Sequence, residues 1–223
     1  MKTFTESELR SIYETKVRKT KDYFGKNNPI PPCPVKKWDN NWNGHDAPRA
    51  FAILDFIDWV EKYNINNIDH LAITCDSDAE LEFITYENSS PIGYPTYDLH
   101  IDYIELHNKF DFFMFNQTIE HLYNPFMAVE NIHKYIKPGG YVYTTVPTIN
   151  IPHMTPAHFN GYNPMGLALL FASAGFEVLE IGQWGNYEYI SKLFKDHHWP
   201  DLTQVTNANE EKNVAQCWVL AKK

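Results

Sequence analysis

The feature that most constrains the fold is a series of short apolar runs that alternates with helical patterns from residue 68 to the C-terminus. The runs are shorter than typical helices and contain many β-branched and aromatic residues, so we expect each to form a strand. Strands that alternate with helices indicate an α/β fold built on a sheet with helical crossovers. The expected strands are "HLAIT" (70–74), "EFITYE" (82–87), "DFFMF" (111–115), "YVYTTVP" (141–147), "FEVLEIG" (176–182) and "AQCWVLA" (215–221).

Three helices are predicted from their end signals. Asp46 is a candidate N-cap for an amphipathic helix that runs through "APRAFAILDFIDWVEKYN". Asn-Pro pairs at 124–125 and 163–164 open two further helices, because asparagine caps a helix and proline fits its first turn. "KPGG" is expected to end the first of these two helices and Gly175 the second.

The first 45 residues differ from the remainder of the chain. A charged helical segment is followed by the proline-rich stretch "NNPIPPCPVKKW" and then by "DNNWNGHDAP". Proline and glycine at this density disfavour regular structure. We therefore expect residues 1–45 to form a helix and a covering loop, and residues 46–223 to form a single domain.

Composition excludes several functional classes. The chain has 223 residues, which is about the size of one domain, and its net charge of −9 disfavours binding to nucleic acid. Its three cysteines are widely spaced, so neither a disulfide framework nor a structural zinc site is indicated. The sequence has no apolar run long enough to cross a bilayer and no signal-peptide pattern at its start, so we expect a cytoplasmic protein without a membrane partner.

The second half of the chain carries a family resemblance. The segment "KFDFFMFNQTIEHLYNPFMAVENIHKYIKPGGYVYTTVP", followed by "GLALLFASAGFEVLEIG", resembles the back half of class I S-adenosylmethionine-dependent methyltransferases. The ordered series of pieces is more specific than any one of them. The resemblance implies a Rossmann-like α/β fold, with a mostly parallel sheet, helices on both faces and an antiparallel C-terminal strand. It also implies S-adenosylmethionine as the cofactor.

The first half departs from that family pattern. The loop after the first expected strand reads "TCDSDAEL" and lacks the glycines that usually approach the cofactor. The next expected strand follows too soon for a full helical crossover, so either the first helix is reduced to about one turn or these two strands are not parallel neighbours. The segment "EFITYENSSPIGYPTYDLHIDYIELHNKFD" resembles short methyltransferases that are associated with glycan synthesis.

The resemblance assigns residues to the cofactor. Glu87, expected at the end of its strand, would bind the ribose hydroxyls, and Asp98 would lie near the adenine amino group. Carboxylates in the glycine-free loop suit the cationic methionine end of the cofactor. If these side chains instead fill the site, the chain is an inactive methyltransferase-like binding module. The predicted cofactor site comprises Thr74, Cys75, Asp76, Asp78, Glu87, Asp98, Asn116 and Gln117.

The Glu-His pair after strand 111–115 is the candidate catalytic site. Residues that follow a strand of this sheet enter the crevice at its carboxyl edge, so Glu120 and His121 are expected to face the methyl acceptor. His121 is the candidate base, because a hydroxyl nucleophile must lose its proton and histidine titrates near neutral pH. An alternative uses Gln117, Glu120 and His121, with two later histidines, to hold a divalent cation. Glutamine is a weak ligand, so a metal is not favoured.

Aromatic and histidine residues suggest the acceptor. Trp42, His153, His158 and Tyr162 are predicted to bind it. Aromatic rings beside polar side chains suit the faces and hydroxyls of a sugar. We therefore expect O-methylation of a sugar hydroxyl in a glycan or nucleotide sugar. The alternative acceptor, a small aromatic or lipid metabolite, would require a deep apolar pocket. The loop "KDHHWPD" is interpreted as surface without chemistry.

Overall fold

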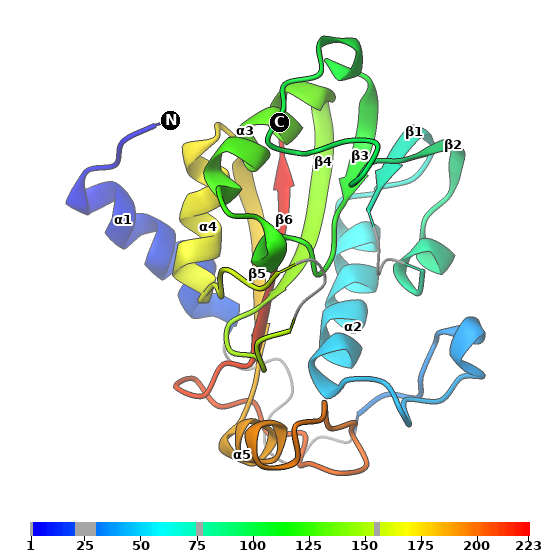
Figure 1. The fold of residues 1–223 in the computed structure, drawn as a ribbon, viewed down its shortest axis with the longest axis vertical. Helices are drawn as coiled ribbons and strands as arrows, with labels where there is room; N and C mark the ends of the chain where they lie inside the picture. The colour runs from blue at the N-terminus through cyan, green and yellow to red at the C-terminus, as the bar shows by residue number, and fades with distance from the viewer. Residues whose placement is uncertain (1, 21–29, 75–77, 154–156) are drawn as a thin grey trace.

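A six-stranded sheet forms the centre of the protein (Figure 1). The computed structural model describes residues 2–20, 30–74, 78–153 and 157–223. The strand order is β2-β1-β3-β4-β6-β5; β6 pairs antiparallel with both β4 and β5, and the pairings among β1 to β4 are parallel. The predicted α/β fold is confirmed, including its antiparallel C-terminal strand. The strands are β1 (Ile68–Ile73), β2 (Tyr86–Pro91), β3 (Phe110–Met114), β4 (Ile136–Pro147), β5 (Glu177–Trp184) and β6 (Gln216–Lys222).

Helices cover both faces of the sheet, and each face has its own apolar core. On one face α2 (Ala47–Lys62) and α5 (Tyr187–Asp196) pack against side chains such as Tyr143 and Trp218. On the other, α3 (Pro125–Tyr135) and α4 (Pro164–Ser173) pack against Phe113 and Val219. The N-terminal helix α1 (Glu6–Ile12) lies beside α4, as Figure 1 shows.

The second strand lies later in the sequence than predicted. Residues Glu80–Phe83 form a 3₁₀ turn, and β2 begins only at Tyr86, so the predicted strand 82–87 is wrong. The apolar side chains of this stretch pack from the turn against the α2 face of the sheet. Because β1 and β2 are parallel, the short connection between them is a reduced helix, which was one of the two expected alternatives.

The "KPGG" segment also differs from its prediction. Helix α3 ends at Tyr135 and β4 starts at the next residue, so "KPGG" lies inside the strand. A Cβ atom on Gly140 would lie only 2.8 Å from the backbone oxygen of Asp111 in β3. Glycine is therefore needed here for the close approach of two strands and not for ending the helix.

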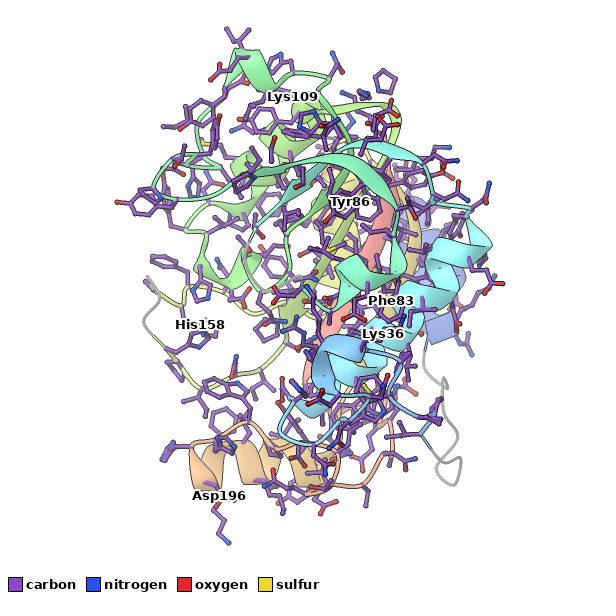
Figure 2. The ribbon with its side chains drawn as sticks, turned by 90° about the vertical axis from the view of Figure 1, so that its right-hand side faces the viewer. Lys36, Phe83, Tyr86, Lys109, His158 and Asp196 are labelled. Carbon is purple, nitrogen blue, oxygen red and sulfur yellow. The ribbon has the colours of Figure 1, made fainter. Side chains whose placement is uncertain are left out.

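The topology places one crevice at the carboxyl ends of the parallel strands. The chain leaves β1 for β2 on one side and returns to β3 on the other, so the sheet has its switch point between β1 and β3. Lys109 and Tyr86, at the starts of β3 and β2, lie in the upper part of Figure 2, whereas His158 and Asp196 lie in the lower part. The carboxyl edge therefore faces the loop after β4 and helix α5.

Candidate active site

The turn after β3 is held rigidly against β4. Gln117 has a positive φ of 49°, which is uncommon for a residue other than glycine or asparagine. Its backbone N–H donates to the Thr145 carbonyl at 2.9 Å, and its side-chain Nε2 donates to Thr145 Oγ1 at 3.0 Å. A 3₁₀ turn, Ile119–His121, follows directly. The backbone bonds fix where the predicted catalytic pair points.

A buried polar network supports this turn from below. The amide of Asn116 donates to Glu80 Oε1 at 3.0 Å and accepts from the Thr145 backbone N–H at 3.1 Å. Glu80 also lies 3.5 Å from the guanidinium of Arg49 on α2. Glu80 and Asn116 are both about 1% exposed. Asn116, predicted to line the cofactor, therefore uses its side chain inside the protein.

His121 is oriented by the loop that follows β4. Its Nδ1 lies 2.8 Å from the Ala157 carbonyl, and because a carbonyl only accepts, Nδ1 carries the proton. Nε2 is then the basic nitrogen of the ring. The loop itself is anchored to the same turn, since Phe159 N–H donates to the Glu120 carbonyl at 2.7 Å and Asn160 Nδ2 to the Leu122 carbonyl at 2.6 Å.

Four of the predicted residues meet in one cavity of about 220 Å³, which we call the polar cavity. They are joined by five residues that the sequence did not suggest for this site. All but one of the nine side chains are polar or charged. The lining consists of Asp46, Arg49, Gln117, Glu120, His121, Asn150, His153, Trp199 and Gln216.

Three imidazoles lie close together, and two of them, His121 and His153, line the polar cavity. The ring centroids of His121 and His153 are 4.9 Å apart, and those of His153 and His158 are also 4.9 Å apart. Burial, with the two neighbouring rings, lowers the pKa of His158. Among the described residues, no three His, Cys, Asp or Glu side chains are arranged to hold a metal ion.

Asp46 occupies the N-cap position of α2, as predicted, but its side chain makes no capping bond. Instead its Oδ1 accepts from the Tyr189 hydroxyl of α5 at 2.6 Å. Burial raises the pKa of Asp46 to about 7, although the Tyr189 hydrogen bond and the nearby Arg49 guanidinium oppose that rise. A carboxyl group in this state takes or gives a proton near neutral pH.

Trp199 was missed because its loop was interpreted as surface. Its indole Nε1 donates to Asn150 Oδ1 at 2.8 Å, and its ring lies 6.0 Å from that of His153. The hydrogen bond joins the loop after α5 to the loop after β4. Together these two loops form one wall of the polar cavity.

A second, larger cavity of about 720 Å³ lies at the carboxyl ends of β1 and β2, and we call it the edge cavity. Hydroxyl groups and aromatic rings dominate its lining, which suits the ribose and the adenine ring of S-adenosylmethionine. Thr74 reaches from here to the turn after β3, because its Oγ1 lies 3.0 Å from that of Thr118. The lining consists of Ile73, Thr74, Ser89, Ser90, Pro91, Ile92, Gly93, Tyr94, Thr96 and Tyr97.

Three other predicted cofactor residues, Asp78, Glu87 and Asp98, do not line the edge cavity. Glu87 is exposed at the amino end of β2, next to Tyr86, and therefore on the opposite edge of the sheet from the crevice. The expectation that it ends its strand is wrong, because β2 starts later than predicted. Asp98 binds His100, whose backbone N–H lowers the pKa of Asp98. Asp78 is exposed, and Cys75 and Asp76 fall outside the described residues.

Two predicted acceptor residues pack elsewhere. Trp42 is buried and donates its indole N–H to the Pro31 carbonyl at 2.9 Å, so it pins the N-terminal loop. Tyr162 packs against the core on the α4 face. Neither residue lines the polar cavity.

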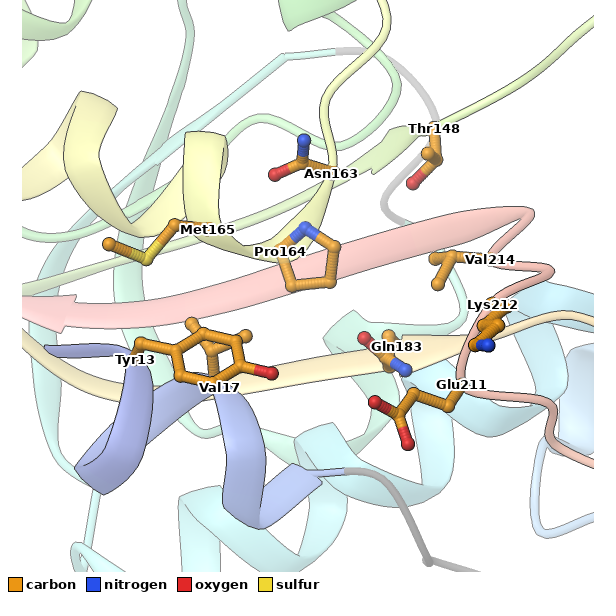
Figure 3. Close-up of a pocket in the computed structure, with 10 residues that line it drawn as sticks. All are labelled: Tyr13, Val17, Thr148, Asn163, Pro164, Met165, Gln183, Glu211, Lys212 and Val214. Atoms are coloured by element: carbon orange, nitrogen blue, oxygen red, sulfur yellow. The ribbon is translucent and has the colours of Figure 1, made fainter. Parts of the chain in front are cut away.

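A third cavity, of about 390 Å³, lies on the α4 face between Tyr13, Pro164, Gln183 and Lys212 (Figure 3). It contains none of the predicted site residues. No helix in the described part of the chain has both the length and the apolar character that a bilayer crossing needs.

Comparisons with known proteins agree with this fold. The model of one protein family, described as a methyltransferase domain, matches residues 44–181. None of the curated proteins matches the chain significantly. Among solved structures, the 1,6-didemethyltoxoflavin-N1-methyltransferase of Burkholderia thailandensis aligns with a TM-score of 0.50 and 11% identity, over 100% of this chain and 92% of its own.

Two further solved structures are similar at lower scores. An S-adenosylmethionine-dependent methyltransferase from Mesorhizobium loti aligns with a TM-score of 0.41 and 10% identity, over 75% of this chain and 98% of its own. One from Archaeoglobus fulgidus aligns with a TM-score of 0.45 and 12% identity, over 77% and 94%. Because the family match spans more than half of the residues, the chain belongs to the methyltransferase domain family, and the prediction of a class I S-adenosylmethionine-dependent methyltransferase is confirmed.

Proposed function

We propose that this protein methylates a hydroxyl group of a sugar, in a glycan or a nucleotide sugar, with the acceptor in the polar cavity. The observation that carries the proposal is the hydrogen bond that orients the His121 ring. Its Nδ1 donates a hydrogen bond to the Ala157 carbonyl, and the ring lines the polar cavity at the carboxyl edge of the sheet. Because Nδ1 donates to that carbonyl, Nε2 is the ring nitrogen left to accept a hydroxyl proton, and imidazole is the side chain best matched to general-base catalysis near pH 7.

We place the adenosine part of the cofactor in the edge cavity. The hydroxyls of Thr74 and Ser89 would bind its ribose, and the ring of Tyr94 would cover its adenine. Thr74 follows β1 and contacts the catalytic turn, so the same residue lies between the two cavities. When bound, S-adenosylmethionine supplies a methyl carbon whose bond to sulfur breaks as the acceptor oxygen forms its bond to that carbon.

The chain's own residues provide alignment and proton transfer. His121 Nε2 takes the proton of the acceptor hydroxyl, which leaves the oxygen electron pair free to attack. Gln117, fixed by its two bonds to Thr145, holds one side of the cavity at a constant distance from β4. In-line displacement depends strongly on such alignment. The buried Glu80–Asn116 pair keeps the turn from shifting when ligands bind.

The lining of the polar cavity supports a hydrophilic acceptor. Apart from the Trp199 ring, its walls carry carboxyl, amide, guanidinium and imidazole groups. A lipid or a large aromatic metabolite would exclude water from these groups without offering them hydrogen bonds, which costs about 1–3 kcal/mol for each polar atom that loses a partner. A sugar offers hydroxyls to the polar groups and an apolar face to the indole.

Mass spectrometry tests this proposal directly. The protein is incubated with S-adenosylmethionine and a panel of methyl hexosides and nucleotide sugars, and products are examined for the mass of one added CH₂. We expect a gain with at least one sugar. The His121→Asn variant should lose it, because asparagine keeps a donor for Ala157 and lacks the basic nitrogen. No gain with any sugar, together with absent binding of S-adenosylhomocysteine by calorimetry, would contradict the proposal.

A further inference from the structure

The carboxyl group of Asp46 is oriented by a hydrogen bond from a buried tyrosine. Tyr189 is about 2% exposed, and its hydroxyl donates to Asp46 Oδ1 at 2.6 Å. Tyr189 stands in the first turn of α5, whose N-cap Asn186 is fixed by bonds to the Thr206 and Ala208 carbonyls, each 2.9 Å. Oδ1 is therefore held in one direction by a rigid helix end.

This orientation has no role in the secondary structure of α2. Asp46 stands at the N-cap of that helix but does not cap it. The Ala47 backbone N–H and the nearby Arg49 guanidinium also act on this carboxyl group. Asp46 lines the polar cavity, and because a carboxylate has about four acceptor sites, it can accept a further hydrogen bond there. Buried or half-buried carboxyl groups are costly unless they gain partners, which points to a ligand that donates.

The polar cavity brings Asp46 and His121 together from distant parts of the chain. One comes from the start of α2, and the other from the turn after β3. The cavity measures only about 220 Å³, so groups that reach both residues must be close to each other on the acceptor. The remaining titratable or charged side chains that line it are Arg49, Glu120 and His153.

We propose that Asp46 binds a second hydroxyl of the acceptor, adjacent to the hydroxyl that His121 deprotonates, so that the substrate class is a sugar with two neighbouring free hydroxyls. This assignment rests on the proposed function. A carboxylate accepts a hydroxyl proton in a hydrogen bond, and two such points fix the ring against the Trp199 face. Two-point binding also sets which of the two hydroxyls is methylated, because the second one is occupied. Tyr189 acts as a positioning residue through Asp46.

The experiment combines a change in the protein with a change in the substrate. Wild type and Asp46→Asn are assayed with methyl α-D-glucoside, methyl α-D-galactoside, methyl α-D-mannoside and their monodeoxy analogues, with separate measurement of kcat and KM. For wild type, removal of the hydroxyl next to the methylated one should raise KM at least tenfold. For Asp46→Asn, KM should already be raised about tenfold with the intact sugar, and the deoxy analogue should raise it little further.

Two other variants keep the test interpretable. Tyr189→Phe removes only the hydroxyl that orients Asp46. We therefore expect KM to rise several-fold while binding of S-adenosylhomocysteine stays unchanged. Asp55→Asn is the matched control, because Asp55 is a buried carboxylate on the same helix that accepts from Trp218 Nε1 at 2.8 Å outside the cavity. It should leave KM unchanged.

Each outcome decides one point. If the deoxy analogue raises KM equally for wild type and Asp46→Asn, Asp46 does not contact that hydroxyl and the assignment is overturned. If sugars that lack a neighbouring hydroxyl are methylated as well as those that have one, the substrate class is wrong while the proposed function stands. If no sugar is methylated by wild type, the proposed function fails and this assignment fails with it.

Discussion

The polar cavity and the edge cavity differ in how far the protein organises them before any ligand binds. The polar cavity is small, and its key side chains are fixed by hydrogen bonds to α5, β4 and the loop after β4. The edge cavity is three times larger, and Tyr94 on its rim is 83% exposed. Rigid charged groups align an acceptor, whereas an open, hydroxyl-lined surface suits a ligand that is exchanged after every turnover.

The first prediction tests whether the polar cavity and the edge cavity have separate roles, and it concerns His121. Replacement by Asn should lower kcat by about 10²–10⁴-fold, the usual contribution of a general base. Calorimetric titration with S-adenosylhomocysteine should show unchanged affinity, since we propose that the cofactor binds in the other cavity. His133→Asn on α3 is the control and should retain full turnover. Weakened cofactor binding in His121→Asn would mean that the two cavities are not separate.

The second prediction concerns the buried network beneath the turn. Glu80→Ala leaves the Asn116 amide and the Arg49 guanidinium without this carboxylate, and we expect a loss of about 3 kcal/mol in the free energy of unfolding. Urea denaturation followed by circular dichroism measures it. The exposed Glu105→Ala is the comparison variant and should change stability little. A small effect of Glu80→Ala would show that the polar cavity is less rigid than we infer.

The third prediction uses the pKa of Asp46. Because the folded-state pKa is raised to about 7, the folded protein holds a proton that the unfolded chain has already lost above about pH 4. Stability should therefore fall as pH rises from about 4 to 7, by about 2 kcal/mol for a partly exposed group. Urea denaturation at pH 5 and pH 8 should show this loss in wild type. Asp46→Asn should not show it, and an equal loss in both proteins would place the titration elsewhere.

The smallest effects should appear at the edge cavity. Tyr94→Ala should weaken binding of S-adenosylhomocysteine by about 1 kcal/mol, because one ring face is lost. Glu87→Ala should have no effect, since Glu87 lies at the amino end of β2. If Glu87→Ala weakens binding more than Tyr94→Ala, the cofactor is not in the edge cavity.

Local patterns predicted the second half of the chain well. The Asn-Pro caps at 124–125 and 163–164 open α3 and α4, and the apolar runs after them form β4 and β5. The turn after β3 was found because it follows a buried strand directly. The prediction failed at 82–87, where apolar side chains pack from a turn and so imitate the pattern of a strand.

About half of the residues that line the polar cavity could not be predicted from sequence patterns. Asp46 has the pattern of an ordinary N-cap, and Trp199 that of a surface loop. Gln216 begins the last strand, far along the chain from both. These residues meet only because α2, α5 and β6 all end or begin at the carboxyl edge of the sheet.

By itself the sequence determined the class of fold, the position of the His121 turn and the methyltransferase family, since each depends on short-range patterns in one continuous segment. Tertiary structure alone decided which carboxylates reach a cavity. Because β2 starts a few residues later than predicted, Glu87 lies at the edge of the sheet opposite the crevice. Asp46 is oriented at the polar cavity by a hydrogen bond from Tyr189, 143 residues later in the chain. Side-chain direction depends on strand register and on packing between distant elements, and neither is encoded in a local pattern.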